Sequence, residues 1–186
     1  MASVVDVCNR ALDKLGHGPI TSLEDGTTAA NLCNRGWPLT RDQVLRDHPW
    51  NFAIKRVITS PLVTTPLWGF SYQHQIPSDM LRLLDICDLS TGEYQREGDV
   101  ILANDEALRI RYVAKITDPN KYDSLFLDAV AARLAFELCE ALTQSNSKKE
   151  ILWNEYQEAL TTAKRVDAQE NPPQIFEESD WIKVRY

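Results

Sequence analysis

The sequence is poor in glycine, in basic residues and in long hydrophobic runs, and each shortage argues against a class of protein. Its 186 residues include only 7 glycines, which disfavours the Gly-rich loops that bind phosphate groups. Lysine and arginine number 20 against 27 acidic residues, whereas dedicated nucleic-acid binders usually carry a basic surface. No apolar run approaches the roughly 20 residues that span a bilayer, so no membrane anchor is expected.

Cysteine and histidine are also sparse, and their scatter argues against a metal site. A zinc site requires ligands that cluster, but no C-x-x-C pair occurs and the histidines lie apart from the cysteines. We therefore expect reduced thiols that pack as small hydrophobic side chains in a protein folding in a cytoplasm. The N-terminus lacks a basic region followed by an apolar run, so no signal peptide is expected. The residues concerned are Cys8, Cys33, Cys87, Cys139, His17, His48 and His74.

Helical periodicity is present at both ends of the chain. Apolar residues at helical spacing predict four helices, over residues 3–15, 26–47, 122–143 and 147–168. Ser3 is the expected cap of the first helix and Gly16 its end. The third helix is apolar on nearly all sides, which indicates a central or intersubunit position, and Pro38 predicts a kink or a break in the second. Length and ordinary composition favour a single domain over residues 1–170.

Between the second and third helices the pattern changes to short strands. Residues 50–116 contain several short runs of β-branched and aromatic residues bounded by turn signals, which predict a small antiparallel sheet. The predicted fold is therefore α+β and mainly α. It is an antiparallel bundle of about four helices with a small antiparallel β-region inserted between the second and third, plus an extended C-terminal arm. Three tryptophans are expected at the junction of bundle and sheet: Trp37, Trp50 and Trp68.

The last segment, residues 171–186, is unusually apolar for the end of a chain. Asn171-Pro172-Pro173 stops the final helix, and the residues that follow are rich in the aromatic and β-branched types that disordered tails lack. One interpretation is a strap docked on its own domain. The other, which we adopt, is an arm that docks on a neighbouring chain, for instance by adding a strand to a sheet edge. Its predicted contact residues are Ile175, Phe176, Trp181, Ile182, Val184 and Tyr186.

Motifs for catalysis are missing. The patterns G-x-S-x-G, H-E-x-x-H, G-x-G-x-x-G and the P-loop do not occur, so no catalytic residue, cofactor or metal ligand is assigned and no enzymatic activity is predicted. His48 is interpreted as satisfying backbone groups at a helix end. Lys55 and Arg56 follow Trp50 and Phe52, which favours cation–π or ion-pair packing over base stacking. A carboxylate pair assembled from distant positions stays open as an alternative.

A resemblance to a known family rests on several segments. Residues 42–56, which include the run His-Pro-Trp-Asn-Phe-Ala-Ile-Lys-Arg, carry the most distinctive one. This run resembles the "LL..HPW.FA..R" signature of tail tubular protein A, the head-to-tail adaptor family of short-tailed bacteriophages. Residues 4–16, 66–82, 110–142 and 163–170 are similar to further segments of that family. The family-signature residues, expected to be structural, are His48, Pro49, Trp50, Phe52 and Arg56.

The resemblance implies a structural role in a phage virion. It implies a homo-oligomeric ring, of twelve copies, between the portal protein and a tail nozzle similar to tail tubular protein B. Genome DNA would pass through the lumen without specific binding, which suits an acidic chain. The protein would be assembled in the bacterial host cytoplasm and reside at the head–tail junction. The alternative is a phage-associated hydrolase acting on cell-wall or capsular polysaccharide.

Overall fold

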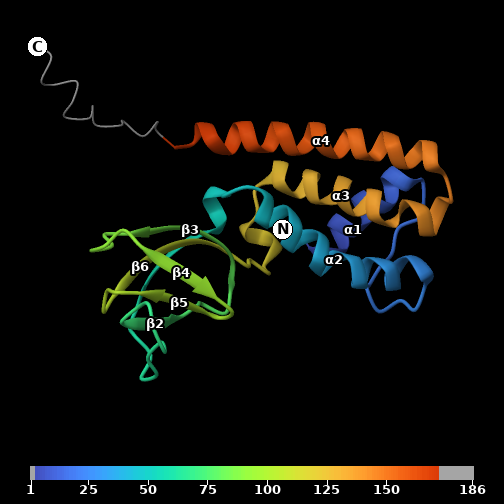
Figure 1. Ribbon diagram of the computed structural model, residues 1–186. Coiled ribbons are helices and arrows are strands. Elements are labelled where there is room, and N and C mark those ends of the chain that lie inside the picture. Colours follow the sequence, from blue (N-terminus) through green and yellow to red (C-terminus); the bar gives the residue numbers. More distant parts are fainter. Residues whose placement is uncertain (1–2, 172–186) are drawn as a thin grey trace, which may run out of the picture.

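The computed structural model describes residues 3–171, which form a helical part and a β part that lie side by side (Figure 1). Two helices come before the strands and two come after them. Short 3₁₀ turns at Asn51–Ala53 and Pro119–Lys121 mark the two passages between the parts. The α-helices are α1 (Val4–Leu15), α2 (Thr28–Asp47), α3 (Ser124–Thr143) and α4 (Asn146–Gln169).

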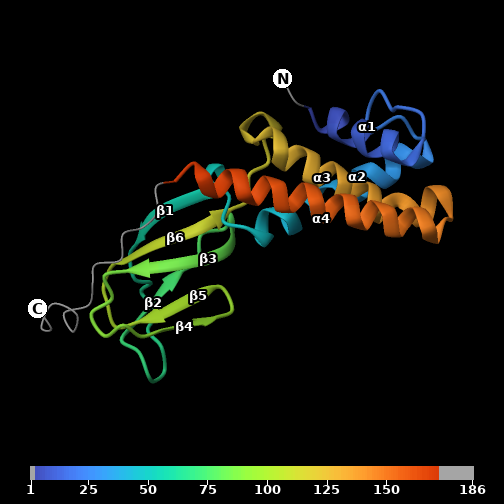
Figure 2. The same cartoon turned by 90° about the horizontal axis from the view of Figure 1, so that it is seen from above.

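Helix α3 is the central helix of the helical part, as its all-round apolar sequence predicts. It packs against α1, α2 and α4, and ten of its residues are buried. Helix α4 covers it from one side only (Figures 1 and 2). Because α3 has neighbours around most of its circumference, it needs no second subunit to cover its apolar side chains.

The ends of the helices follow local sequence rules. Ser3 and Asp6 form a capping box at the start of α1, and Gly16 ends that helix with a φ of 71°. Helix α2 continues without interruption through Pro38, so of the expected kink or break the break is wrong. A proline removes one backbone hydrogen bond, but burial of Trp37, Val44 and Leu45 on the inner face of α2 holds the helix together.

The β part contains six strands in two separate antiparallel sheets. In one sheet β6 lies between β1 and β3, and in the other β5 lies between β2 and β4. Buried residues of both sheets, among them Ile101 and Ile110, belong to one hydrophobic cluster that also includes helical residues. The strands are β1 (Ile54–Thr59), β2 (Tyr72–Gln75), β3 (Met80–Cys87), β4 (Tyr94–Glu97), β5 (Val100–Ala103) and β6 (Leu108–Ala114).

The predicted fold class, a mainly helical bundle with a small inserted β-region, is therefore wrong. The described residues hold four α-helices and two three-stranded sheets, with 49% helix and 20% strand. The β part is a second structural half with its own buried side chains and not one small sheet. Each middle strand pairs with a strand distant in sequence, and such long-range pairing is invisible to a reading of local periodicity.

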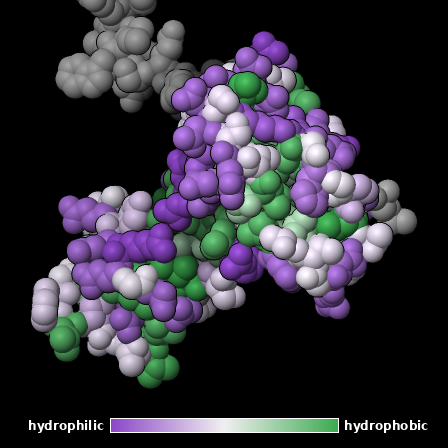
Figure 3. Space-filling view, turned by 90° about the vertical axis from the view of Figure 1, so that its right-hand side faces the viewer, coloured by the Kyte–Doolittle hydropathy of each residue, from purple (hydrophilic) through white to green (hydrophobic). Residues whose placement is uncertain are grey.

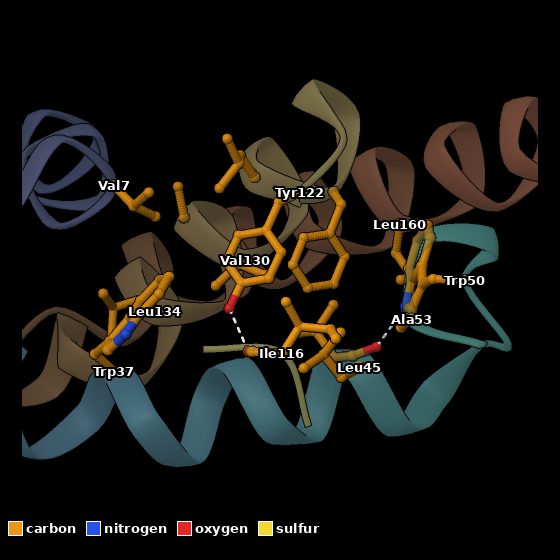
Figure 4. Close-up of a cluster of buried hydrophobic side chains, with 14 of the residues drawn as sticks. Val7, Trp37, Leu45, Trp50, Ala53, Ile116, Tyr122, Val130, Leu134 and Leu160 are labelled. Atoms are coloured by element: carbon orange, nitrogen blue, oxygen red, sulfur yellow. Dashed lines mark hydrogen bonds between the residues drawn. The ribbon is translucent and has the colours of Figure 1, made fainter. Parts of the chain in front are cut away.

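The hydrophobic core is continuous across the boundary between the two parts (Figure 4). Tyr122 and Val130, from the α3 side, lie opposite Leu45 of α2, and Trp50 stands beside Leu160 of α4. The Tyr122 hydroxyl donates a hydrogen bond to the Ile116 carbonyl. No helix within residues 3–171 combines the length and the apolar character needed to cross a membrane.

Candidate functional site

The signature segment forms the joint between the helical part and the β part. His48 ends α2, and its Nε2 lies 2.9 Å from Asp167 Oδ2 in the last turn of α4. The Asn51 backbone N–H donates to Asp167 Oδ1 at 3.0 Å, and the Asn51 side chain donates to the Asp167 carbonyl at 2.6 Å. The structure thus corrects the interpretation of His48, since its partner is a carboxylate and not the backbone.

The two aromatic residues of the signature anchor this joint in the core. Trp50 is 1% exposed, and its indole N–H donates to the Val44 carbonyl at 2.9 Å. Phe52 packs against both Phe126 and Tyr122, with ring centroids 5.0 and 5.8 Å away. Edge-to-face and tilted aromatic contacts of this kind favour one arrangement of the rings. The joint is therefore held by packing of Trp50 and Phe52 as well as by hydrogen bonds.

Lys55 and Arg56, which follow on β1, are not part of this aromatic cluster. Lys55 Nζ forms an ion pair with Asp79 Oδ2 at 2.6 Å, and the Tyr112 hydroxyl donates to Asp79 Oδ1 at 2.9 Å. Burial alone would raise the pKa of Asp79, but these two hydrogen bonds outweigh it and hold that pKa below its usual value. Burial, together with Asp79, raises the pKa of Tyr112 to about 12. Ion pairing is thus confirmed for Lys55, while Arg56 has no ion pair within residues 3–171.

The sequence reasoning missed Asp167, the residue on which the joint depends. It lies in a helical segment where acidic residues usually face water, and only 9% of it is exposed. Nothing in its local pattern distinguishes it from its polar neighbours, because its partners are more than 100 positions away. The signature residues His48, Trp50 and Phe52 are brought together, whereas Arg56 lies apart on the sheet.

A loop between β1 and β2 carries an exposed apolar patch. Val63, Leu67 and Trp68 are 102%, 91% and 80% exposed, so the expected place of Trp68 at the junction is wrong. Leu67 and Trp68 border a hollow of about 290 Å³ that the second sheet also lines. Figure 3 shows green, hydrophobic surface at the low end of the molecule, where Figure 1 has this loop. We call Val63, Leu67 and Trp68 the loop patch.

A second aromatic surface lies where α3 and α4 meet. The Arg133 guanidinium sits over the rings of Phe136, Trp153 and Tyr156 at 5.3–5.4 Å. A hollow of about 680 Å³ borders Phe136 and Trp153. These three rings are the cation–π partners of Arg133. They lie far in sequence from Trp50 and Phe52, beside which cation–π packing of Lys55 or Arg56 was one of the predictions.

Carboxylates gather beside the joint, and each has a structural contact. Asp123 caps α3, Asp167 binds His48 and Asn51, and Glu170 accepts from Asn51 at 3.4 Å. Within residues 3–171 no three such side chains are arranged so that they could hold a metal ion. The hydrolase alternative stays an untested prediction. The predicted arm contacts, Ile175 to Tyr186, lie outside the described residues.

Comparison with known proteins gives no family assignment, since no family model and no curated protein matches this chain.

Proposed function

We propose that this protein is a structural head-to-tail adaptor of a short-tailed phage. In this proposal, copies of the chain form a ring, of twelve copies as the family resemblance implies, between the portal protein and the tail nozzle. The protein is assembled in the bacterial host cytoplasm and then resides in the virion at the head–tail junction. The genome passes through the ring without specific binding, and no catalysis is involved.

The observation that carries this proposal is the loop patch. Three large apolar side chains within six positions stand almost completely in water on a loop that projects from the β part. Clustered exposed apolar residues of this kind mark protein-contact surfaces, and tryptophan is among the residues most enriched at energetic centres of interfaces. A docking role for this loop explains why the sequence keeps them where they are unfavourable in an isolated chain.

Two further features support an adaptor. The joint formed by His48, Asn51 and Asp167 fixes the helical part relative to the β part, and a ring wall needs subunits of constant shape to close. The aromatic surface at Phe136 and Trp153 provides a second contact area on another part of the molecule. Two different surfaces are what a head-to-tail ring contact requires of each copy.

The proposal is tested by the mass of the assembly in solution. The chain is co-expressed with the portal and nozzle proteins of the same phage genome, and purified complexes are weighed by mass photometry. We expect a ring joined to the portal. The double variant Leu67→Ser/Trp68→Ser should reduce this complex by at least tenfold. The matched control Thr65→Ala, in the same loop, should assemble normally.

Either of two results would overturn the proposal. One is a wild-type chain that stays monomeric in the presence of both partners. The other is activity on peptidoglycan or capsular polysaccharide together with failure to join the portal, which would favour the hydrolase alternative.

A further inference from the structure

The hollow between α3 and α4 is a shallow groove with aromatic walls. On the α4 side its lining residues recur at helical spacing, so they form a single stripe along that helix. On the α3 side Phe136 packs against Trp153, with ring centroids 5.0 Å apart, and Trp153 is still 38% exposed. The volume of about 680 Å³ lies within the range of clefts that bind ligands. The lining residues are Phe136, Asn146, Lys149, Glu150, Trp153 and Asn154.

The cations beside this hollow are already paired within the chain. Arg133, whose guanidinium lies over the aromatic rings, forms an ion pair with Glu137 at 2.7 Å. Lys149 forms one with Glu140, also at 2.7 Å. A strongly charged partner would have to compete with these pairs, whereas an uncharged apolar partner leaves them in place. The hollow therefore suits an uncharged, apolar occupant.

The loop patch has the chemistry that this hollow suits. Residues 60–73, which contain it, include no aspartate, glutamate, lysine, arginine or histidine. Leu67 and Trp68 stand 91% and 80% exposed on this loop. A tryptophan brings a large apolar ring that packs well on other aromatic rings, and an indole N–H that needs an acceptor. The amide oxygens of Asn146 and Asn154, at the rim of the hollow, are suitable acceptors.

The loop does not reach the hollow of its own molecule. Figures 1 and 2 both place the loop between β1 and β2 at the far end of the β part, and the turn between α3 and α4 at the far end of the helical part. A contact between these two surfaces therefore joins two copies of the chain. Because the two surfaces differ, the contact is head-to-tail, and such contacts close into a ring when the rotation allows it.

The size of the loop patch indicates that one such contact is weak by itself. A buried tryptophan contributes about 150–250 Å², whereas a stable interface buries roughly 800 Å² on each partner. In a closed ring each copy makes the contact twice, once through its loop and once through its hollow. Contacts made together in this way strengthen one another. Between isolated copies we therefore expect a short-lived contact, which a covalent trap can detect.

We propose that the loop patch of one copy docks into the hollow between α3 and α4 of the next copy. In this arrangement Trp68 packs against Phe136 and Trp153 of its neighbour. The inference rests on the proposed function in one respect, since it takes the loop patch as a docking surface. It adds the partner of that surface, which is a second copy of this chain.

Photo-crosslinking of the full-length chain alone tests this contact. The variant Trp68→p-benzoylphenylalanine keeps an aromatic side chain in the loop and becomes reactive on irradiation. Unlabelled and isotopically labelled variant protein are mixed in equal amounts at high concentration and irradiated. Mass spectrometry of the peptides then identifies the attachment site and shows whether it joins two chains. We expect crosslinks between chains, from position 68 to residues 136–154.

A charge placed at the rim of the hollow should prevent the contact. Asn154 is exposed and lines the hollow, so Asn154→Glu should leave the fold intact. We expect it to lower the crosslink yield about tenfold, because covering an unpaired charge with apolar side chains is unfavourable. The matched control is Thr162→Glu, at an exposed position of α4 outside the hollow, which should leave the yield unchanged. Circular dichroism of each variant establishes that it is folded.

The proposal is wrong if no crosslink between chains forms, if position 68 attaches to another part of the second copy, or if Asn154→Glu leaves the yield as it was. The adaptor function can fail independently of this contact. A crosslink at residues 136–154 in a chain that never joins the portal would contradict the adaptor alone. A ring that joins the portal while position 68 attaches elsewhere would contradict this inference alone.

Discussion

Asp167 connects three elements of the molecule through one carboxylate. It receives hydrogen bonds from Asn51 and lies against His48, so it joins the end of α4 to the end of α2 and the start of β1. Asp167 is only 9% exposed, so its hydrogen bonds are protected from water. Buried hydrogen bonds to a carboxylate contribute more to stability than exposed ones.

Replacing Asp167 therefore tests the joint. Asp167→Ala leaves the Asn51 N–H without an acceptor in a largely buried place, and we expect a loss of about 2 kcal/mol of unfolding free energy. Asp167→Asn keeps an oxygen for that N–H and should lose clearly less. Urea denaturation of both variants measures the difference. Equal losses in the two variants would show that the bond to Asn51 is not what stabilises the joint.

A second single residue, Asp79, should make the stability of the protein depend on pH. Its pKa is lower in the folded protein than its ordinary value of 3.8, so its contribution to stability is present above that value and is lost as the pH falls through the folded pKa. Asp79→Asn should be about 1 kcal/mol less stable than wild type at pH 7. We expect this difference in stability to shrink as the pH is lowered below 3.8. Thermal unfolding of wild type and variant across a pH series measures it. A gap that is constant with pH would contradict the assignment.

At the scale of elements, the close approach of α2 and α3 depends on Gly36. A Cβ placed there would lie 3.1 Å from Leu134 Cδ1 and 3.6 Å from Leu138 Cδ2. Both leucines are buried in α3, the helix that all others contact. The sequence alone gives no reason for a glycine in the middle of a helix, where it is unfavourable.

A larger side chain at this position should push the two helices apart. We expect Gly36→Val to reduce the unfolding free energy by about 2 kcal/mol, as overpacked core sites do. Gly18→Val is the matched control, because a Cβ at Gly18 meets nothing within 4 Å, and it should change stability by less than about 0.5 kcal/mol. Differential scanning calorimetry compares the two melting temperatures. Similar melting temperatures would mean that α2 and α3 have room to adjust.

For the whole molecule, the described residues share one core. Within residues 3–171 the buried cluster runs from α1 through both sheets to α4. Removing residues 172–186 should therefore leave a folded chain with an unchanged circular dichroism spectrum. In the proposed adaptor, the same truncation should prevent stable joining to the portal or the nozzle, measured by co-purification. A truncated chain that still co-assembles normally would show that the segment is not a docking arm.

Much of the secondary structure was predictable from the sequence, and the candidate sites were less so. The four helices begin and end within about two residues of their predicted bounds, because capping residues such as Ser3 and Gly16 are local signals. The exposure of the tryptophans was harder to predict, since Trp50 is buried and Trp68 is almost fully exposed. Both are large and aromatic, and only the surrounding fold decides which of them faces water.

The sequence by itself determined the helices, the presence of short strands within residues 50–116 and the apolar character of α3, because periodicity and capping act over a few neighbouring residues. Only the tertiary structure decided that the strands form two sheets, that Asp167 meets His48, and that Arg56 lies opposite Arg111. Those contacts join residues tens of positions apart. Burial of apolar side chains in the shared core brings these distant residues together, and no local window of the sequence contains that core.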